Sequence, residues 1–168
     1  MKTIMIVSLI AAAVIGLGIV LFKYGNTKPQ DIPQKGQAVE LQPAAHIAVG
    51  AAHDPYNSNP PTSGPHYAEP ANWGVYQQVL PDEQVIHNLE HGGIWISYKD
   101  IDSQTKDELE TIGRQYYGAV VVSPRPHDDA KISLASWGRL EKLDSFNRDE
   151  IINFIKANKN KSPEKLAR

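Results

Sequence analysis

VIHNLEHGG, at residues 85–93, is the stretch that decides the fold. We predict a helix over Asp82–His91, which places His87 and His91 one turn apart on one face, where both imidazoles can reach a single metal ion. Gly92 then lies just past the helix end, where glycine adopts a left-handed conformation at little cost. At this spacing a second interpretation stays open, in which the two imidazoles only cap the helix C-terminus and complement its dipole.

Glu90 completes the pattern His-x-x-Glu-His, which matches the inverzincin motif, where the glutamate is a general base beside zinc. The motif is short, and inverzincins also need a long helix and a distant third ligand. Here Gly92-Gly93 ends the predicted helix after a few turns. A small metal-dependent hydrolase with Glu90 as its catalytic group is therefore the least favoured of the functions that we consider.

The composition excludes several classes of function. The chain has 168 residues, enough for one domain with a real core, and 17 basic against 19 acidic side chains give a formal net charge of -2. This balance gives no electrostatic reason to expect nucleic-acid binding. The chain has six histidines and no cysteine. Disulfides, a thiol nucleophile and cysteine-ligated metals are therefore excluded, and any metal site must use nitrogen and oxygen ligands.

The N-terminal stretch Ile4–Phe22 contains no charged residue, and Ser8 is its only polar side chain. As a helix, it would span roughly the 30 Å of a bilayer's hydrocarbon core. The alternative is a cleaved signal peptide, whose apolar region is shorter and ends at a site with small residues. Because the stretch ends in Leu-Phe-Lys-Tyr, we favour an uncleaved signal anchor, a transmembrane helix within residues 1–24.

The orientation of this anchor is not fixed by the positive-inside rule, because lysines lie on both sides of it (Lys2, then Lys23, Lys28 and Lys35). A very short N-terminal tail normally stays in the cytoplasm. We therefore expect the rest of the chain to lie outside the cytoplasm, in the periplasm or at the cell surface. Residues 25–42 have the composition of a flexible linker, although an ordered arm packed on the domain is the alternative.

A long proline-rich loop is expected next, between residues 43 and 70. Six prolines exclude helix over most of this span: Pro43, Pro55, Pro60, Pro61, Pro65 and Pro70. Loops of this length are often functional when they occur in a compact domain. His46, His53 and His66 lie within the loop, where the prolines reduce the entropy lost on holding a side chain at a site.

The remaining sequence predicts an α+β domain over residues 43–160, with a small mixed or antiparallel sheet and a few helices. The apolar and β-branched runs predict strands at Ile94–Tyr98, Ala119–Ser123 and Ile132–Trp137. Helices are expected from Asp102 or Ser103 to about Tyr116, and over Arg148–Asn158. The polar tail, residues 161–168, is expected to fray. His127 falls in a solvated turn.

Three motifs resemble the bacterial family called domain of unknown function 3105: PPTSGPH at residues 60–66, GVY at residues 74–76 and HNLEHG at residues 87–92. The segment HIAVG, residues 46–50, is similar to the start of the family pattern, and so the resemblance favours His46 over His53 as a member of the histidine set. It also implies a membrane-anchored protein. The family name implies no activity.

The sequence as a whole thus predicts a membrane-anchored, extracytoplasmic domain that binds one transition-metal ion. We expect the ligands to be His46, His66, His87 and His91, with Glu90 as an alternative ligand or as an acid that orients an imidazole. Imidazole suits copper(II) or zinc, while copper(I) is disfavoured without cysteine.

The alternative is a cell-envelope binding or scaffold module that holds no metal and recognises an unknown envelope partner. In that protein the histidines are structural. It predicts an exposed apolar or aromatic patch around Trp73 and Tyr76.

Overall fold

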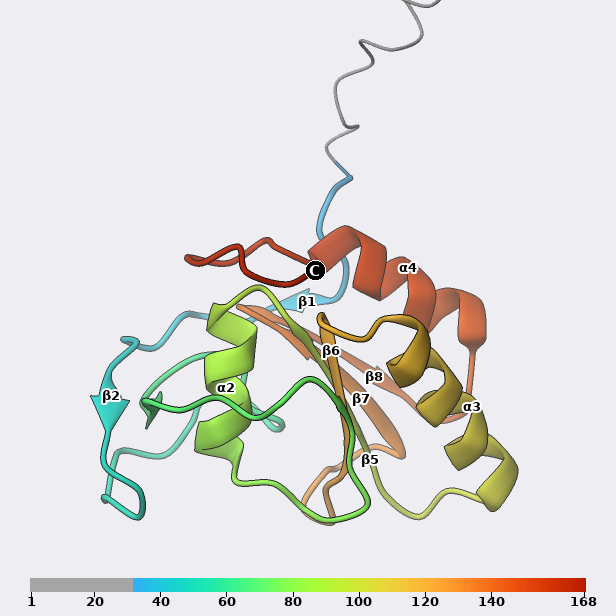
Figure 1. Ribbon diagram of the computed structural model, residues 1–168, viewed down its shortest axis with the longest axis horizontal. Helices are drawn as coiled ribbons and strands as arrows, with labels where there is room; N and C mark the ends of the chain where they lie inside the picture. The colour runs from blue at the N-terminus through green and yellow to red at the C-terminus, as the bar shows by residue number, and fades with distance from the viewer. Residues whose placement is uncertain (1–31) are drawn as a thin grey trace, which may run out of the picture. The chain divides into compact units, whose positions relative to one another are not determined.

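The computed structural model describes residues 32–168 (Figure 1). The predicted membrane anchor and the first part of the predicted linker lie outside these residues. Within the described part, no helix is long and apolar enough to cross a membrane. Residues 33–168 form one compact unit with two hydrophobic cores, one on each face of its central sheet.

A mixed sheet forms the centre of the domain, in the order β1-β8-β7-β5-β6-β4. Antiparallel pairing joins β1, β8, β7 and β5, and parallel pairing joins β5, β6 and β4. The strands span Gln37–Ala38 (β1), Gly74–Val75 (β4), Ile94–Tyr98 (β5), Val120–Pro124 (β6), Ile132–Ser136 (β7) and Arg139–Leu143 (β8). The predicted strands are confirmed to within two residues at each end, whereas β8 and the two-residue strands were not predicted.

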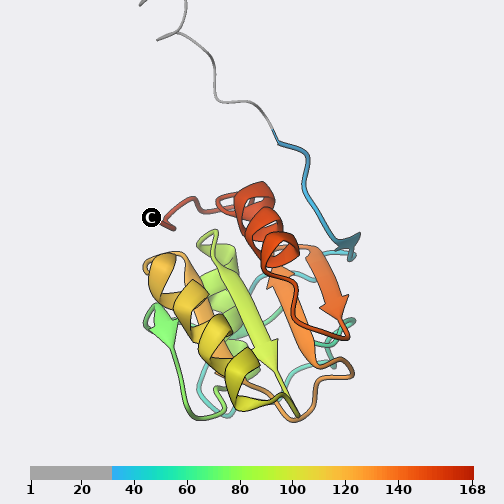
Figure 2. The same ribbon diagram turned by 90° about the vertical axis from the view of Figure 1, so that its right-hand side faces the viewer.

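Helices cover both faces of this sheet. They are α2 (Asp82–Glu90), α3 (Ser103–Gln115) and α4 (Arg148–Asn158). Figures 1 and 2 show α2 on one face and α3 with α4 on the other. The strands are apolar on both sides because each face is covered: Trp95 packs towards α2, while Ile94 and Ile96 pack towards α3 and α4. The three helices predicted within the domain and the α+β class are confirmed.

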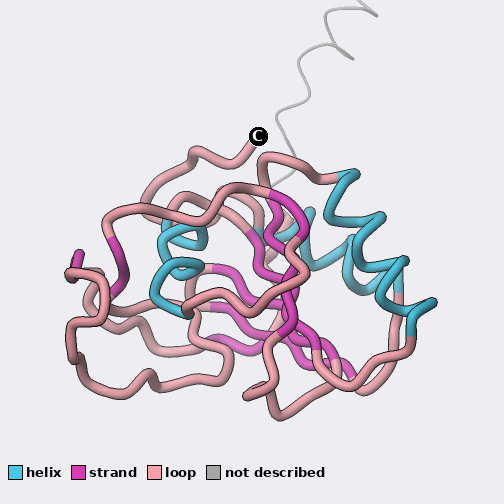
Figure 3. The backbone as a smooth tube through the Cα atoms, turned by 60° about the horizontal axis from the view of Figure 1, so that its bottom comes forward, coloured by secondary structure: helices cyan, strands magenta, loops and turns pink. Residues whose placement is uncertain are grey.

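The proline-rich segment contains a second, much smaller sheet. Its strands are β2 (His46–Ile47) and β3 (His66–Tyr67), which pair in parallel. Figure 3 shows this pair among the long loops, apart from the main sheet. The segment is therefore a loop over most of its length, as predicted, but two short pieces of it are joined by backbone hydrogen bonds.

Helix α2 is fixed to its surroundings at its start and in its middle. The Arg125 guanidinium donates to both carboxylate oxygens of Asp82, at 2.8 and 2.7 Å, and also to Asp128 Oδ1 at 2.6 Å. In the middle, the buried Asn88 amide donates to Ala71 O and accepts from Ala71 N, both at 2.9 Å. These bonds set the position of the helix relative to the loops that face it.

The C-terminal segment, residues 161–168, closes the other end of α2. Glu164 N donates to Glu90 O at 3.1 Å, and the backbone N–H groups of Leu166 and Ala167 donate to His91 O at 2.9 and 3.0 Å. The last carbonyls of a helix have no partner within the helix, so this segment satisfies them. The prediction that this tail frays is wrong, because its backbone is paired with α2.

Candidate metal centre

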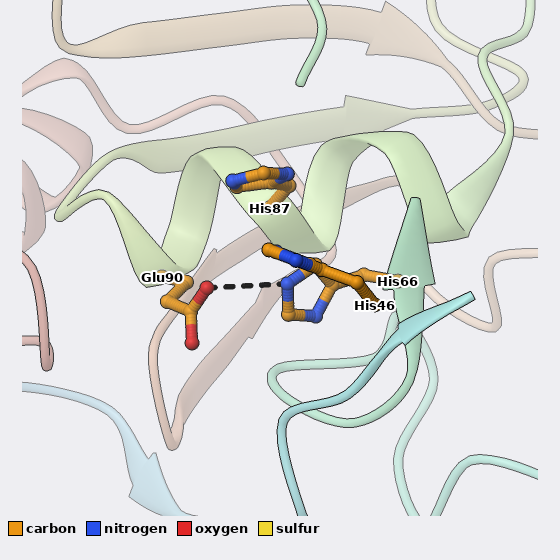
Figure 4. Close-up of side chains that lie close together, drawn as sticks. All are labelled: His46, His66, His87 and Glu90. Carbon is orange, nitrogen blue, oxygen red and sulfur yellow. Dashed lines mark ion pairs between the residues drawn. The ribbon is translucent and has the colours of Figure 1, made fainter. Parts of the chain in front are cut away.

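Three histidines and one glutamate from different parts of the chain meet beside α2. They are His46, His66, His87 and Glu90, and one potential ligand atom from each lies within 4.8 Å of all the others. We call this set the His–Glu group (Figure 4). His87 and Glu90 project from the same face of α2 because they are three residues apart in the helix.

The parallel pair of β2 and β3 brings His46 and His66 together. Their Cα atoms are register partners, so side chains twenty positions apart in sequence stand next to each other. The two ring centroids are 5.0 Å apart, and each is within 5.0 Å of the His87 ring. His66 is buried, whereas His46 is exposed.

Gly64 shapes the turn that presents His66. Its φ of +122° lies in a region that residues with a side chain rarely adopt, and a Cβ there would lie 3.0 Å from the Tyr56 ring. The Tyr56 hydroxyl donates to Pro65 O at 2.7 Å. Tyr56 thus packs on Gly64 and bonds to Pro65, and the turn that it holds sets the direction of the His66 imidazole.

Backbone carbonyls fix the tautomers of the two buried imidazoles. His66 Nδ1 lies 2.8 Å from Gly64 O, and His87 Nδ1 lies 2.7 Å from Tyr67 O. Because a carbonyl oxygen only accepts, Nδ1 carries the hydrogen in both rings. Nε2 of each ring is then the atom available to a metal. Metal-binding histidines in proteins are held in this way.

Glu90 faces His66 in a way that leaves a buried lone pair without a partner. Glu90 Oε2 lies 3.1 Å from His66 Nε2, an ion pair by distance, shown as the dashed line in Figure 4. The buried His66 Nε2 nevertheless has no hydrogen-bond partner among the described residues. A cation between the nitrogen and the carboxylate would satisfy both groups.

The environment of His87 favours the neutral ring, which is the form that binds a metal. Burial lowers the pKa of the His87 imidazole below its ordinary value, and the neighbouring histidines lower it further. Three imidazoles this close together would repel one another if each carried a charge. The arrangement therefore has the chemistry of a nitrogen and oxygen ligand set.

His91 lies beside the His–Glu group, not within it. Helix α2 ends at Glu90, and His91 is the C-cap residue. Its Nε2 lies 3.0 Å from His87 Nε2 and also 3.0 Å from Glu164 Oε2. Glu90, the predicted alternative ligand, belongs to the group and His91 does not. Glu164 was not predicted. Gly92 has the predicted left-handed conformation, with a φ of +88°.

The other two histidines lie outside the group. His53 interacts with Asp54 O at 2.7 Å and with Glu83 Oε1 at 3.3 Å. The hydrogen bond to the Asp54 backbone raises the pKa of His53. His127 is exposed, in the predicted turn. The preference for His46 over His53 thus agrees with the geometry of the described residues.

The aromatic residues that were expected to form an exposed patch pack against the core instead. Trp73 and Tyr76 are half-buried and contact the apolar cluster beneath α2. Neither is among the exposed large apolar side chains of the described region, which are Ile32, Leu41, Val49, Val79, Tyr117 and Leu166. The two rings themselves are thus not the fully exposed surface that this alternative predicts.

The chain matches one protein-family model, described as protein of unknown function (DUF3105), over residues 51–168. This range is more than half of the chain. The chain belongs to the DUF3105 family. No curated protein and no solved structure matches it. The DUF3105 match contains His66, His87, Glu90, His91 and Glu164, whereas His46 lies before its first residue.

Proposed function

We propose that this DUF3105 protein binds one divalent transition-metal ion, copper(II) or zinc, through His46, His66, His87 and Glu90. The observation that carries the proposal is the orientation of the two buried imidazoles. Each donates Nδ1–H to a backbone carbonyl, at 2.8 and 2.7 Å, so that Nε2 of each ring offers a lone pair. The His66 lone pair faces the Glu90 carboxylate, and the His87 lone pair faces His91 Nε2. A metal ion is the ligand that such a set of lone pairs fits.

The distances within the group support a single ion. Two ligands bound at about 2.1 Å in a tetrahedral site lie about 3.4 Å apart. His66 Nε2 and Glu90 Oε2 are already 3.1 Å apart. The ligand atoms of the whole group lie within 4.8 Å of one another, so inward rotation of the side chains brings them to ligand distances.

The ligand types restrict the metal. Three imidazoles and one carboxylate suit zinc or copper(II), while magnesium and calcium prefer sites made of oxygen alone. Copper(I) prefers thiolate and thioether ligands. The chain has no cysteine, and its two methionines, Met1 and Met5, precede the domain. The chemistry thus supports copper(II) or zinc and does not favour either.

The exposure of His46 supports a role in holding and releasing the metal. The other three ligands come from buried or half-buried positions, but His46 lies on an exposed two-residue strand. His46 is therefore the ligand of the proposed set whose bond to the metal breaks most readily. Glu90 faces His66 and does not project freely as a general base would, which argues against the hydrolase alternative.

The N-terminal sequence supports the cellular placement that we propose. The uncharged stretch Ile4–Phe22 is long enough to anchor the chain in a membrane, and we propose that the domain follows on the non-cytoplasmic side. In that position, the domain meets metal ions arriving from outside the cell, without competition from cytoplasmic thiols.

Elemental analysis tests the proposal. A soluble fragment beginning near Lys28, without a histidine tag, keeps every described element and both cores. After loading with zinc or copper(II) and dialysis, we expect one equivalent per chain in the fragment and in the His53→Ala control. His87→Ala should retain none. Full retention of metal in His87→Ala, or no metal in the unaltered fragment, would refute the proposal.

A further inference from the structure

A second pair of metal-binding side chains lies next to the His–Glu group. His91 Nε2 is 3.0 Å from His87 Nε2 on one side and 3.0 Å from Glu164 Oε2 on the other. Among the side chains of the group, His87 is the one that His91 contacts. Histidine and glutamate are both common ligands of zinc and copper(II).

Backbone hydrogen bonds fix Glu164 in this position. The Glu164 N–H donates to Glu90 O, and the backbone N–H groups of Leu166 and Ala167 donate to His91 O. At the end of the segment, Arg168 N donates to Gly118 O at 2.9 Å. The Glu164 side chain is half exposed, yet its backbone is tied to the residues that it faces. Its carboxylate is therefore not at His91 by the chance placement of a loose tail.

This row of atoms has more hydrogen-bond acceptors than hydrogens to share among them. His87 Nε2 offers a lone pair, because the hydrogen of that ring is on Nδ1 facing Tyr67 O. A carboxylate oxygen of Glu164 also only accepts. His91 Nε2 lies between these two acceptors and has at most one hydrogen to donate. A metal ion bound by His91 and Glu164 would satisfy both, as it would at His66 and Glu90.

The side chains form a series from the surface to the interior. The exposed fractions are 51% for Glu164, 20% for His91, 5% for His87 and 1% for His66. His87 has a single free nitrogen, so it cannot bind one ion beside His91 and another beside His66 at the same time. It can, however, remain bound to one ion while the other ligands of that ion are exchanged.

We infer that His91 and Glu164 form an outer site that captures a divalent transition-metal ion and passes it through His87 to the His–Glu group. This inference rests on the proposed function. On capture, His91 Nε2, the Glu164 carboxylate and His87 Nε2 replace water ligands of the ion. On transfer, the bond to His87 remains, the bonds to His91 and Glu164 break, and bonds to His46, His66 and Glu90 form in their place. The oxidation state of the metal does not change.

The test compares rates of zinc uptake and release in the full-length chain in detergent micelles. Zinc uptake is followed by stopped-flow with a chromophoric chelator, and release by transfer to excess chelator. The variant is Glu164→Gln, which keeps the size of the side chain and removes its charge. The control is Glu108→Gln, since Glu108 is 44% exposed and lies on α3, on the opposite face of the sheet.

An outer site lies on the path in both directions, so its loss slows uptake and release together. We expect both rates to fall by about tenfold in Glu164→Gln, with the zinc dissociation constant within about twofold of the unaltered chain. Glu108→Gln should match the unaltered chain in all three quantities.

Two outcomes would overturn the inference while the proposed function stands. One is rates in Glu164→Gln equal to those of the control. The other is unchanged uptake with faster release and weaker affinity, which would make Glu164 a ligand of the final site. Absence of bound zinc in the unaltered chain would be a different failure, that of the proposed function itself.

Discussion

His46 lies directly opposite His66 in the parallel pair of β2 and β3, with their ring centroids 5.0 Å apart. The two histidines differ in burial, because His66 is enclosed by the loop and α2 while His46 faces solvent. This difference predicts unequal contributions to metal affinity.

We expect His66→Ala to weaken zinc binding by at least about 100-fold, since even the loss of a residue that only orients a ligand costs about 10–100-fold. His46→Ala should weaken it by about tenfold, because ordering an exposed side chain offsets part of the gain. Isothermal titration of the two variants measures both effects. Equal losses in the two variants, or a loss of the same size in the His53→Ala control, would contradict this ranking.

Replacing Glu90 with glutamine should have opposite effects with and without metal. Glutamine keeps the shape, and its NH₂ group can donate to the unpartnered His66 Nε2, so the metal-free protein should gain about 1 kcal/mol of stability. Zinc affinity should fall by about 10–100-fold, because a charged ligand is lost. Thermal unfolding in chelator measures the change in stability of the metal-free protein, and thermal unfolding in excess zinc measures the loss of stabilisation by the metal.

For the proposed metal site to stand, Glu90→Gln must be more stable than the unaltered chain in chelator and must bind zinc more weakly. If the variant were less stable than the unaltered chain in chelator, Glu90 and His66 would form an ordinary charged pair in the metal-free protein. The structural argument for a missing cation would then be lost.

Asn88 should matter for stability and for the site together. Its amide makes two hydrogen bonds of 2.9 Å to the backbone of Ala71, and Asn88→Ala leaves both of those buried groups without a partner. We expect a loss of about 3 kcal/mol in the free energy of unfolding, measured with urea. Zinc affinity should fall as well, because the same helix carries His87 and Glu90.

The matched control is Asn158→Ala. The Asn158 side chain is equally buried, and its amide also makes two hydrogen bonds to one residue, the backbone of Lys35, at 3.1 and 3.2 Å. Neither Asn158 nor Lys35 belongs to the His–Glu group. Asn158→Ala should lose less stability, because water can bond to the backbone of the exposed Lys35, and it should keep its zinc affinity. An Asn88→Ala variant with unchanged affinity would show that the position of α2 does not depend on this amide.

The pH dependence of stability has a source far from the metal ligands. Burial raises the pKa of the Glu141 carboxyl above its ordinary value, and the neighbouring Glu150 carboxyl raises it further. The folded protein therefore holds this proton more tightly than the unfolded chain. The contribution to stability is full below the ordinary pKa of glutamate and is lost as pH rises through the raised pKa.

Glu141→Gln should remove this loss. Melting temperatures of the metal-free variant and of the unaltered chain should be similar near pH 4, and the variant should melt at the higher temperature near pH 7. Glu150→Gln should show a smaller gain of the same sign, because burial of Glu141 remains. A variant that melts at a lower temperature than the unaltered chain at neutral pH would contradict the assignment.

Local sequence patterns were sufficient for the longer elements. Helix α4 was predicted from a buried apolar stripe of four residues. Ile151, Phe154 and Ile155 are buried as predicted, whereas Ile152 is only half-buried. Strand β5 was predicted from a continuous apolar run. Strand β8 was missed because charged residues interrupt its apolar pattern; Arg139, Glu141 and Lys142 remain partly or fully exposed along it.

The candidate site was predictable in its residue types but not in its long-range contacts. The spacing of His87 and His91 predicts that their imidazoles converge, and their Nε2 atoms are 3.0 Å apart. The contact of His91 with Glu164 had no local signal. No local pattern marks a two-residue strand, so the register of His46 and His66 had no signal. Glu164 lies in a segment with the composition of a polar tail. Only the backbone hydrogen bonds of this segment to the end of α2 bring Glu164 to His91.

Anomalous diffraction at the zinc edge, from crystals of the domain grown with zinc, tests the central claim most directly. We predict one peak, at about 2.0–2.2 Å from His66 Nε2 and His87 Nε2 and within ligand distance of Glu90. No peak there, or a peak only at a separate place such as the pair of His53 and Glu83, would contradict the account.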